Sequence, residues 1–103
     1  MARQHLSKDD LEIVGQCLTA AVDGPFFPDW EFSLLFGLER TEVASVTRAW
    51  PDVSDEDEIA ERAVNNALAN LAGYPHGEDL RRFVSVDAAR LFEILKKWQR
   101  GQA

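Results

Sequence analysis

The chain has 103 residues, with 18 acidic and 11 basic side chains and a net charge of -7. This length predicts one domain over residues 1–103, and the acidic balance argues against a nucleic-acid partner, which would require an excess of Lys and Arg. No apolar run approaches the length of a membrane span. The N-terminus has no apolar leader, and the single cysteine excludes an internal disulfide. We therefore expect a cytoplasmic protein.

The first predicted helix covers Lys8–Asp23. Ser7 is a suitable N-cap, because its hydroxyl can accept a hydrogen bond from the first turn. The Asp10 carboxylate can accept one from the Ser7 backbone N–H, as in a capping box. Apolar residues recur at spacings of three and four along this segment, which predicts one buried face. We expect Gly24 to end the helix in the left-handed conformation and residues 1–6 to fray.

Aromatic residues are concentrated in the segment Phe26–Phe36, which holds five of the ten in the chain. Asp29 is a suitable N-cap for a short helix over residues 30–36, which Gly37 would end. A helix that is apolar on most sides must be buried on most sides or face a partner. The residues expected to point into the core are Phe32, Leu35 and Phe36.

Two more helices are predicted before the next glycine-rich stretch. Thr41 can cap a helix over residues 42–50, which Pro51 follows. Ser54 can cap a longer helix that runs to about Ala72, with a clear apolar stripe at helical spacing. Connections of this length are usual between packed helices.

The last predicted helix begins after Asp87 and leaves a tail at residues 101–103. Residues 80–84 fit either a short helical turn or an extended piece. No segment alternates apolar and polar residues with the period of a strand. The sequence therefore predicts an all-α fold, a compact orthogonal or up-down bundle of four longer helices and one short helix.

An acidic run precedes the fourth predicted helix. Its members are Asp52, Asp55, Glu56, Asp57 and Glu58. A calcium loop does not fit, because the required glycine and the final glutamate are missing at their positions. Acidic side chains are favoured near a helix N-terminus by the helix dipole. The alternative is a recognition surface for a basic partner.

Charge is also distributed unevenly along the chain, and aromatic side chains lie in its acidic half. Residues 1–61 carry 14 acids and 4 bases, whereas residues 62–103 carry 4 acids and 7 bases. This polarity could steer a cationic partner or a second copy, or simply aid solubility. We expect one or two of Phe26, Phe27 and Trp30 to remain accessible as anchors for a partner.

Two asparagines, Asn66 and Asn70, lie four residues apart on the fourth predicted helix and so share a face. Asparagine is a poor helix former, so its presence here needs a reason. We expect these amides to hold the backbone of the turn at residues 73–77 or of the turn at residues 24–29. Direct contact with a ligand is the alternative interpretation.

A small-molecule or catalytic pocket is the second candidate site. It would combine Trp30 with Asn66, Asn70, Tyr74 and His76. The histidine and its acidic neighbours are too few for a zinc site. Cys17 falls next to an apolar stripe, where a thiol behaves as a small hydrophobic group. The sequence predicts no metal, no other cofactor and no catalytic residue.

The general properties of the chain are similar to those of small bacterial immunity proteins, which bind toxic nucleases. The similarity is in size, acidic charge and helix content, with no motif that matches residue by residue. The favoured hypothesis is a non-enzymatic interaction module that binds a basic protein, as a monomer or homodimer. The alternatives are the pocket near Trp30 and His76, and a homo-oligomeric structural protein.

Overall fold

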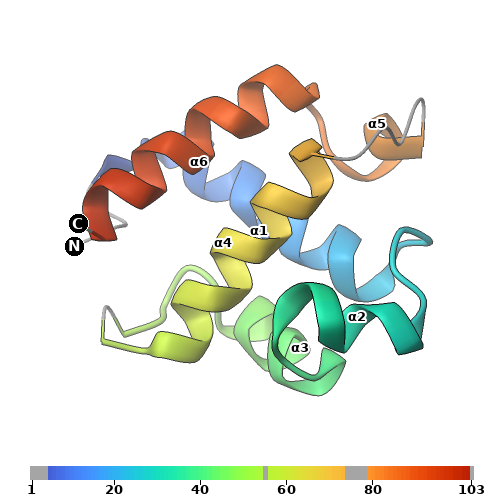
Figure 1. Cartoon of the computed structure of the whole chain (residues 1–103). Coiled ribbons are helices and arrows are strands. Elements are labelled where there is room, and N and C mark those ends of the chain that lie inside the picture. Colours follow the sequence, from blue (N-terminus) through green and yellow to red (C-terminus); the bar gives the residue numbers. More distant parts are fainter. Residues whose placement is uncertain (1–4, 55, 74–78, 103) are drawn as a thin grey trace.

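A computed structural model of the chain describes residues 5–54, 56–73 and 79–102 (Figure 1). The helices of these ranges are α1 Lys8–Asp23, α2 Asp29–Phe36, α3 Arg40–Ala49, α4 Glu58–Gly73, α5 Asp79–Phe83 and α6 Ala88–Gln102. The predicted all-α bundle is confirmed. In Figure 1, α2 and α3 are seen almost end-on while α1, α4 and α6 run across the view, so the bundle is of the orthogonal kind.

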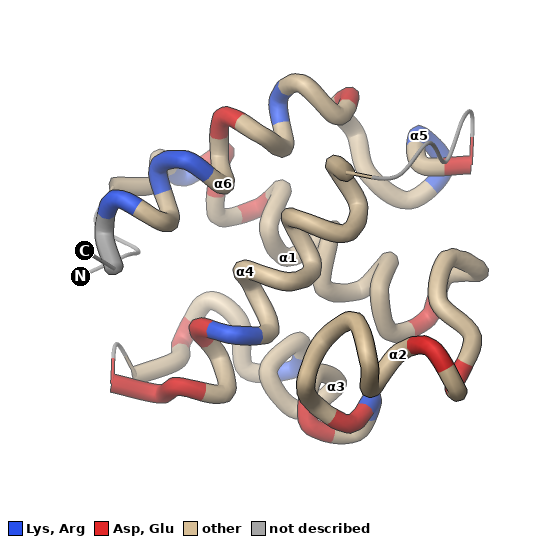
Figure 2. The backbone as a smooth tube through the Cα atoms, viewed as in Figure 1, with Lys and Arg blue, Asp and Glu red and all other residues tan. Residues whose placement is uncertain are grey.

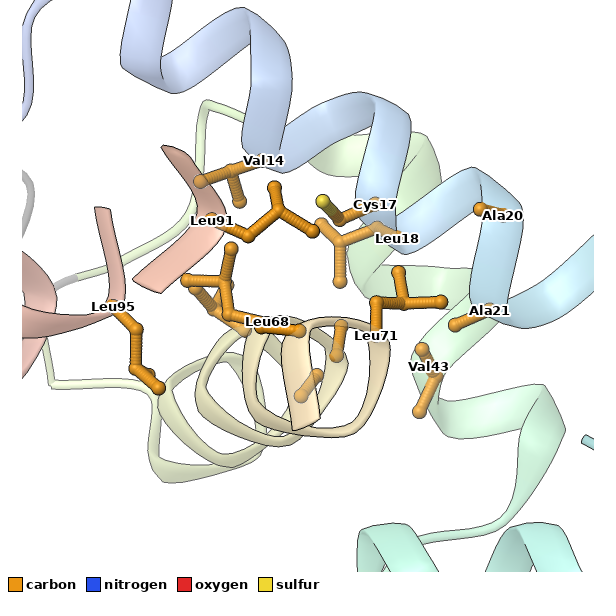
Figure 3. Packing of buried hydrophobic residues seen from close by; sticks show 14 of the residues in the cluster. Val14, Cys17, Leu18, Ala20, Ala21, Val43, Leu68, Leu71, Leu91 and Leu95 are labelled. Carbon is orange, nitrogen blue, oxygen red and sulfur yellow. The ribbon is translucent and has the colours of Figure 1, made fainter. Parts of the chain in front are cut away.

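Helix α4 is the centre of the bundle, because it packs on α1, α2, α3 and α6. Figure 3 shows Val14 and Leu18 of α1 facing Leu68 and Leu71 of α4, with Leu91 of α6 beside them. All five side chains are fully buried. Burying one such side chain contributes roughly 1.5–3 kcal/mol relative to leaving it exposed. The apolar stripes that predict these helices are thus the surfaces that hold them together.

The beginning of α1 follows the prediction, whereas its end does not. The Ser7 hydroxyl accepts a hydrogen bond from the Asp10 backbone at 3.0 Å, and the Asp10 carboxylate accepts one from the Ser7 backbone at 3.0 Å. Gly24 has a φ of -81° and extended backbone, so the predicted left-handed ending is wrong. Its N–H still donates to the Ala20 carbonyl at 2.9 Å, and Pro25 prevents a further helical turn.

Both ends of the described chain are more ordered than the sequence predicts. Leu6 lies in the predicted frayed segment, yet its side chain is buried in the core. Residues 101 and 102 belong to α6 rather than to a tail. Burial of Leu6 offsets the entropy lost on ordering the chain, and α6 continues its backbone hydrogen bonds until Gln102.

Helices α2 and α3 begin one or two residues earlier than predicted. Asp29 is the first residue of α2 rather than its cap, and the extended Pro28 takes the N-cap position with no side-chain hydrogen bond. The Asp29 carboxylate instead accepts a hydrogen bond from Arg40 at 2.9 Å. Helix α3 begins at Arg40 with Glu39 as N-cap, and Thr41 lies inside the helix. The Glu39 N–H donates to the Glu42 carboxylate at 2.9 Å, which satisfies a backbone donor before the first turn.

The N-cap of helix α4 also differs from the predicted one. The Asp57 carboxylate, rather than the Ser54 hydroxyl, accepts hydrogen bonds from the N–H groups of Ile59 and Ala60, at 3.0 and 3.1 Å. An aspartate at this position both caps the helix and faces its positive dipole end. The ambiguous segment at residues 80–84 is largely helical, since it overlaps α5.

Candidate functional site

One face of α2 is apolar and exposed to solvent. Trp30 is 73% exposed and Leu34 is 78% exposed, and they lie one helical turn apart on the same face. The expectation that one or two of Phe26, Phe27 and Trp30 stay accessible is met by Trp30, whereas Phe27 is 4% exposed and does not serve as an anchor. Its ring packs in the core with its centroid 5.4 Å from that of Phe36. Phe26 is half-buried and packs edge-on against Phe83 of α5.

The opposite face of α2 anchors the helix in the core. Phe32 and Phe36 stack with centroids 4.3 Å apart, and both are buried as predicted. Leu35 is half-buried against the same core. This division explains why a segment that is apolar on most sides still leaves an exposed apolar face. Sequence reasoning did not single out Leu34, although its spacing of four from Trp30 is the signal that could have found it.

Arg40 fixes the position of α2 against α1. Its guanidinium donates to the carbonyls of Ala21 and Val22 at 3.2 and 2.7 Å. It also donates to the carbonyl of Phe27, and its carbon Cζ lies 4.4 Å from the centroid of the Phe32 ring. These acceptors are carbonyls at the end of α1 and in the segment that follows it, and the last carbonyls of a helix have no partner within the helix. One side chain therefore holds the start of α2 against the end of α1.

The two asparagines of α4 hold the other end of α2. Asn66 Nδ2 donates to the Phe36 carbonyl at 2.7 Å, and Asn70 Nδ2 donates to the Leu35 carbonyl at 3.4 Å. Asn70 Nδ2 also donates to the Asn66 carbonyl of its own helix at 2.8 Å. Both amides thus bind the last carbonyls of α2, and most of the turn at residues 73–77, the other expected partner, lies outside the described residues. Gly37 ends α2 in the left-handed conformation, with a φ of 65°, as predicted.

An open groove of about 780 Å³ separates the end of α2 from the start of α4. Leu34 contributes to one wall, and Glu58 and Glu61 contribute to the other. Its remaining lining residues are Leu35, Phe36, Gly37, Arg62, Asn65 and Asn66. The fold therefore places the exposed apolar face of α2 beside carboxylates of α4, although the two segments are more than twenty residues apart in sequence.

One member of the acidic run, Glu58, lines this groove. Asp52, Glu56 and Glu58 are exposed, whereas Asp57 is half-buried as the cap of α4. Asp55 lies outside the described residues. Figure 2 shows the acidic positions more abundant around α2, α3 and the start of α4, and the basic positions more abundant on α5 and α6. The uneven charge along the sequence is therefore also uneven in space.

The residues of the second candidate site are not brought together in the described part of the structure. Trp30 lies on the outer face of α2, and the amides of Asn66 and Asn70 bind backbone carbonyls. Tyr74 and His76 lie outside the described residues. Contact of a ligand with Asn66, Asn70, Tyr74 and His76 stays a prediction.

Cys17 is fully buried, and desolvation raises the pKa of its thiol to about 12. The thiol is therefore protonated at neutral pH and packs as an apolar group, as predicted. In residues 5–54, 56–73 and 79–102, no three His, Cys, Asp or Glu side chains are grouped closely enough to hold a metal ion.

Comparisons with protein families, with curated proteins and with solved structures find no match to this chain. None of the described helices is both long and apolar enough to cross a membrane. Of the predicted binding residues, Glu58 and Asn66 line the groove between α2 and α4, and Leu34 of the exposed apolar face lines it with them. We define the binding face by five of its residues, Trp30, Leu34, Glu56, Glu58 and Glu61.

Proposed function

We propose that this chain is a cytoplasmic interaction module that binds a basic protein through the binding face. The observation that carries the proposal is the exposure of Trp30 and Leu34 on one face of α2. Large apolar side chains that remain adjacent and exposed in a folded domain commonly mark a partner site. Tryptophan is also enriched among the residues that dominate binding energy at protein interfaces.

The charge around these anchors favours a basic partner. Leu34 shares its groove with Glu58 and Glu61, and Glu56 is exposed just before α4. Carboxylates around an apolar centre steer a cationic surface into register and raise the association rate more than the affinity. The expected binding is therefore fast at low salt and slows as salt screens these charges.

The proposal can be tested by capture from a lysate of the source cell, followed by reconstitution with the purified partner. Two variants remove the anchors, Trp30→Ala and Leu34→Ala. A third combines Glu58→Gln with Glu61→Gln, which spares the capping carboxylate of Asp57. We expect a basic protein to bind the wild type and to bind the two anchor variants at least about tenfold more weakly, equivalent to 1.4 kcal/mol. The double glutamine variant should chiefly slow association and reduce its salt dependence.

Matched controls keep this test specific. Phe92→Ala removes an apolar side chain of α6 that is 43% exposed. Asp9→Asn combined with Glu12→Gln removes the same charge from the exposed side of α1. Both controls should bind the partner as the wild type does. A partner that is acidic, or that binds the Trp30→Ala and Leu34→Ala variants with unchanged affinity, would show the proposal to be wrong.

A further inference from the structure

A second, smaller hollow lies on the other side of the first turn of α4. It has a volume of about 280 Å³ and lies between α3 and the start of α4. Its apolar lining consists of Val46, Ala49, Val53 and Ile59, and its polar lining consists of Glu42, Ser45 and Asp57. We call it the α3/α4 pocket. Ile59 lines this pocket while Glu58 and Glu61 line the groove, so both hollows border the first turn of α4.

The size and lining of the α3/α4 pocket favour one anchoring side chain. Sites for cofactors and other small molecules commonly occupy about 300–1,000 Å³, so this pocket is at the lower limit. Ile59 is 43% exposed here, and Ala49 is exposed at the end of α3. Apolar pockets within a protein interface commonly receive one anchoring side chain of the partner.

Carboxylates surround the apolar centre of the pocket. Glu42 and Asp57 both line it and are both half-buried. Oδ1 of Asp57 accepts the two hydrogen bonds that cap α4, so this carboxylate is fixed in place. A fixed carboxylate beside an apolar cavity complements a segment in which an aliphatic side chain is flanked by lysine or arginine.

Resting on the proposed function, we infer that the basic partner inserts one aliphatic side chain into the α3/α4 pocket. The lysine or arginine residues on either side of this anchor face Glu42 and Asp57. The partner then covers the first turn of α4 and contacts the groove beyond it. A second copy of this chain is the competing occupant, because Phe92 of α6 is exposed one turn from Lys96.

Three short peptides serve as probes, and the methyl NMR signals of Val46, Val53 and Ile59 serve as the readout. The first peptide is Lys-Lys-Leu-Lys-Lys with blocked ends. The second replaces its leucine by glycine, and the third replaces its lysines by glutamates. We expect saturable shifts with the first peptide, and at least about tenfold weaker binding of the other two. Equal binding of the first two peptides, or no shift with the first, would overturn the inference.

Two variants with the same substitution complete the test. Ala49→Phe fills the pocket from an exposed position, whereas Ala89→Phe adds the same ring on the exposed side of α6. The first variant should lose the shifts caused by the leucine peptide, and the second should keep them. Shifts that persist in Ala49→Phe would overturn the inference. So would the same shifts on concentrating the protein alone, since they would identify a second copy as the occupant.

The failure of this inference can be told apart from the failure of the proposed function. If the purified partner binds Ala49→Phe as well as it binds Ala89→Phe, but no longer binds Trp30→Ala, only the pocket assignment is wrong. If the partner is retained by Trp30→Ala and Leu34→Ala, the proposed function is wrong as well.

Discussion

The Lys97 ammonium nitrogen of α6 lies 2.9 Å from Oδ2 of Asp10, in the first turn of α1. Oδ1 of the same carboxylate accepts a hydrogen bond from Arg90. Asp10 is fully buried, whereas the two basic side chains are partly exposed. The capping carboxylate predicted from sequence is therefore also the ion-pair partner that ties the last helix of the bundle to the first.

Replacement of Asp10 should destabilise the protein in a pH-dependent way. Burial raises the pKa of Asp10, but hydrogen bonds from the Ser7 backbone, Lys97 and Arg90, with the charge of Arg90, outweigh burial and lower this pKa from 3.8 to about 2. The folded state therefore binds this proton less readily than the unfolded state. The resulting stabilisation is present above about pH 4 and is lost as the pH falls towards about 2.

Urea denaturation of Asp10→Asn and of the wild type checks this prediction. At pH 7 we expect the variant to be less stable by about 2 kcal/mol, and by a smaller amount near pH 2. Asp9→Asn is the control, because its side chain is exposed and adjacent in sequence. A difference between Asp10→Asn and the wild type that did not shrink at low pH would contradict the assigned ion pairs.

Arg40 should be irreplaceable by lysine. Its guanidinium binds three backbone carbonyls and the Asp29 carboxylate while lying over the Phe32 ring, a geometry that one ammonium group cannot reproduce. We expect Arg40→Lys to lower the free energy of unfolding by about 2–3 kcal/mol. Arg48→Lys on the same helix should cost no more than about 0.5 kcal/mol, because Arg48 is exposed. Thermal unfolding that ranked the two variants equally would contradict this role.

The contribution of the hydrogen bond from Asn66 to α2 can be measured by comparing alanine variants of Asn66 and of the adjacent Asn65. Asn66→Ala and Asn65→Ala gain the same helix propensity, so their difference in stability reports the contacts that each amide makes. Asn66 donates to the Phe36 carbonyl at 2.7 Å, whereas Asn65 contacts only side chains in the described structure, at 3.3 Å. We expect Asn66→Ala to be less stable than Asn65→Ala by about 1–2 kcal/mol in chemical denaturation. Equal stabilities would show that the bond contributes nothing.

Truncation of two aromatic residues of α2 should change the free energy of unfolding by very different amounts. Phe32 is 1% exposed and stacks on Phe36, so Phe32→Ala should cost about 3–5 kcal/mol through the lost contacts and the cavity. Trp30→Ala should change the free energy of unfolding by no more than about 0.5 kcal/mol, because this side chain is exposed. A large loss of stability in Trp30→Ala would mean that the indole serves the fold rather than a binding face.

Local patterns in the sequence were sufficient for the helices and for some of their ends. Spacings of three and four predict α1 and α4, and the Ser7 cap and the left-handed Gly37 are where the sequence places them. These features depend on residues within one or two helical turns of each other, so the chain specifies them without its tertiary contacts. The predicted N-caps of α2, α3 and α4 were misplaced by one to three residues. Several suitable acceptors compete before α3 and α4, whereas Pro28 takes the cap position of α2 without a side-chain hydrogen bond.

The candidate site depended on contacts between distant segments. The acidic run and the aromatic segment were visible in the sequence, but which aromatic side chains stay exposed was decided by the rotation of α2. Arg40 sets that rotation through carbonyls eighteen and nineteen residues earlier, and Asn66 does so through a carbonyl thirty residues earlier. Backbone carbonyls carry no sequence signature, so no pattern could have paired them with these side chains. The packing of α2 therefore buried Phe27 and exposed Leu34.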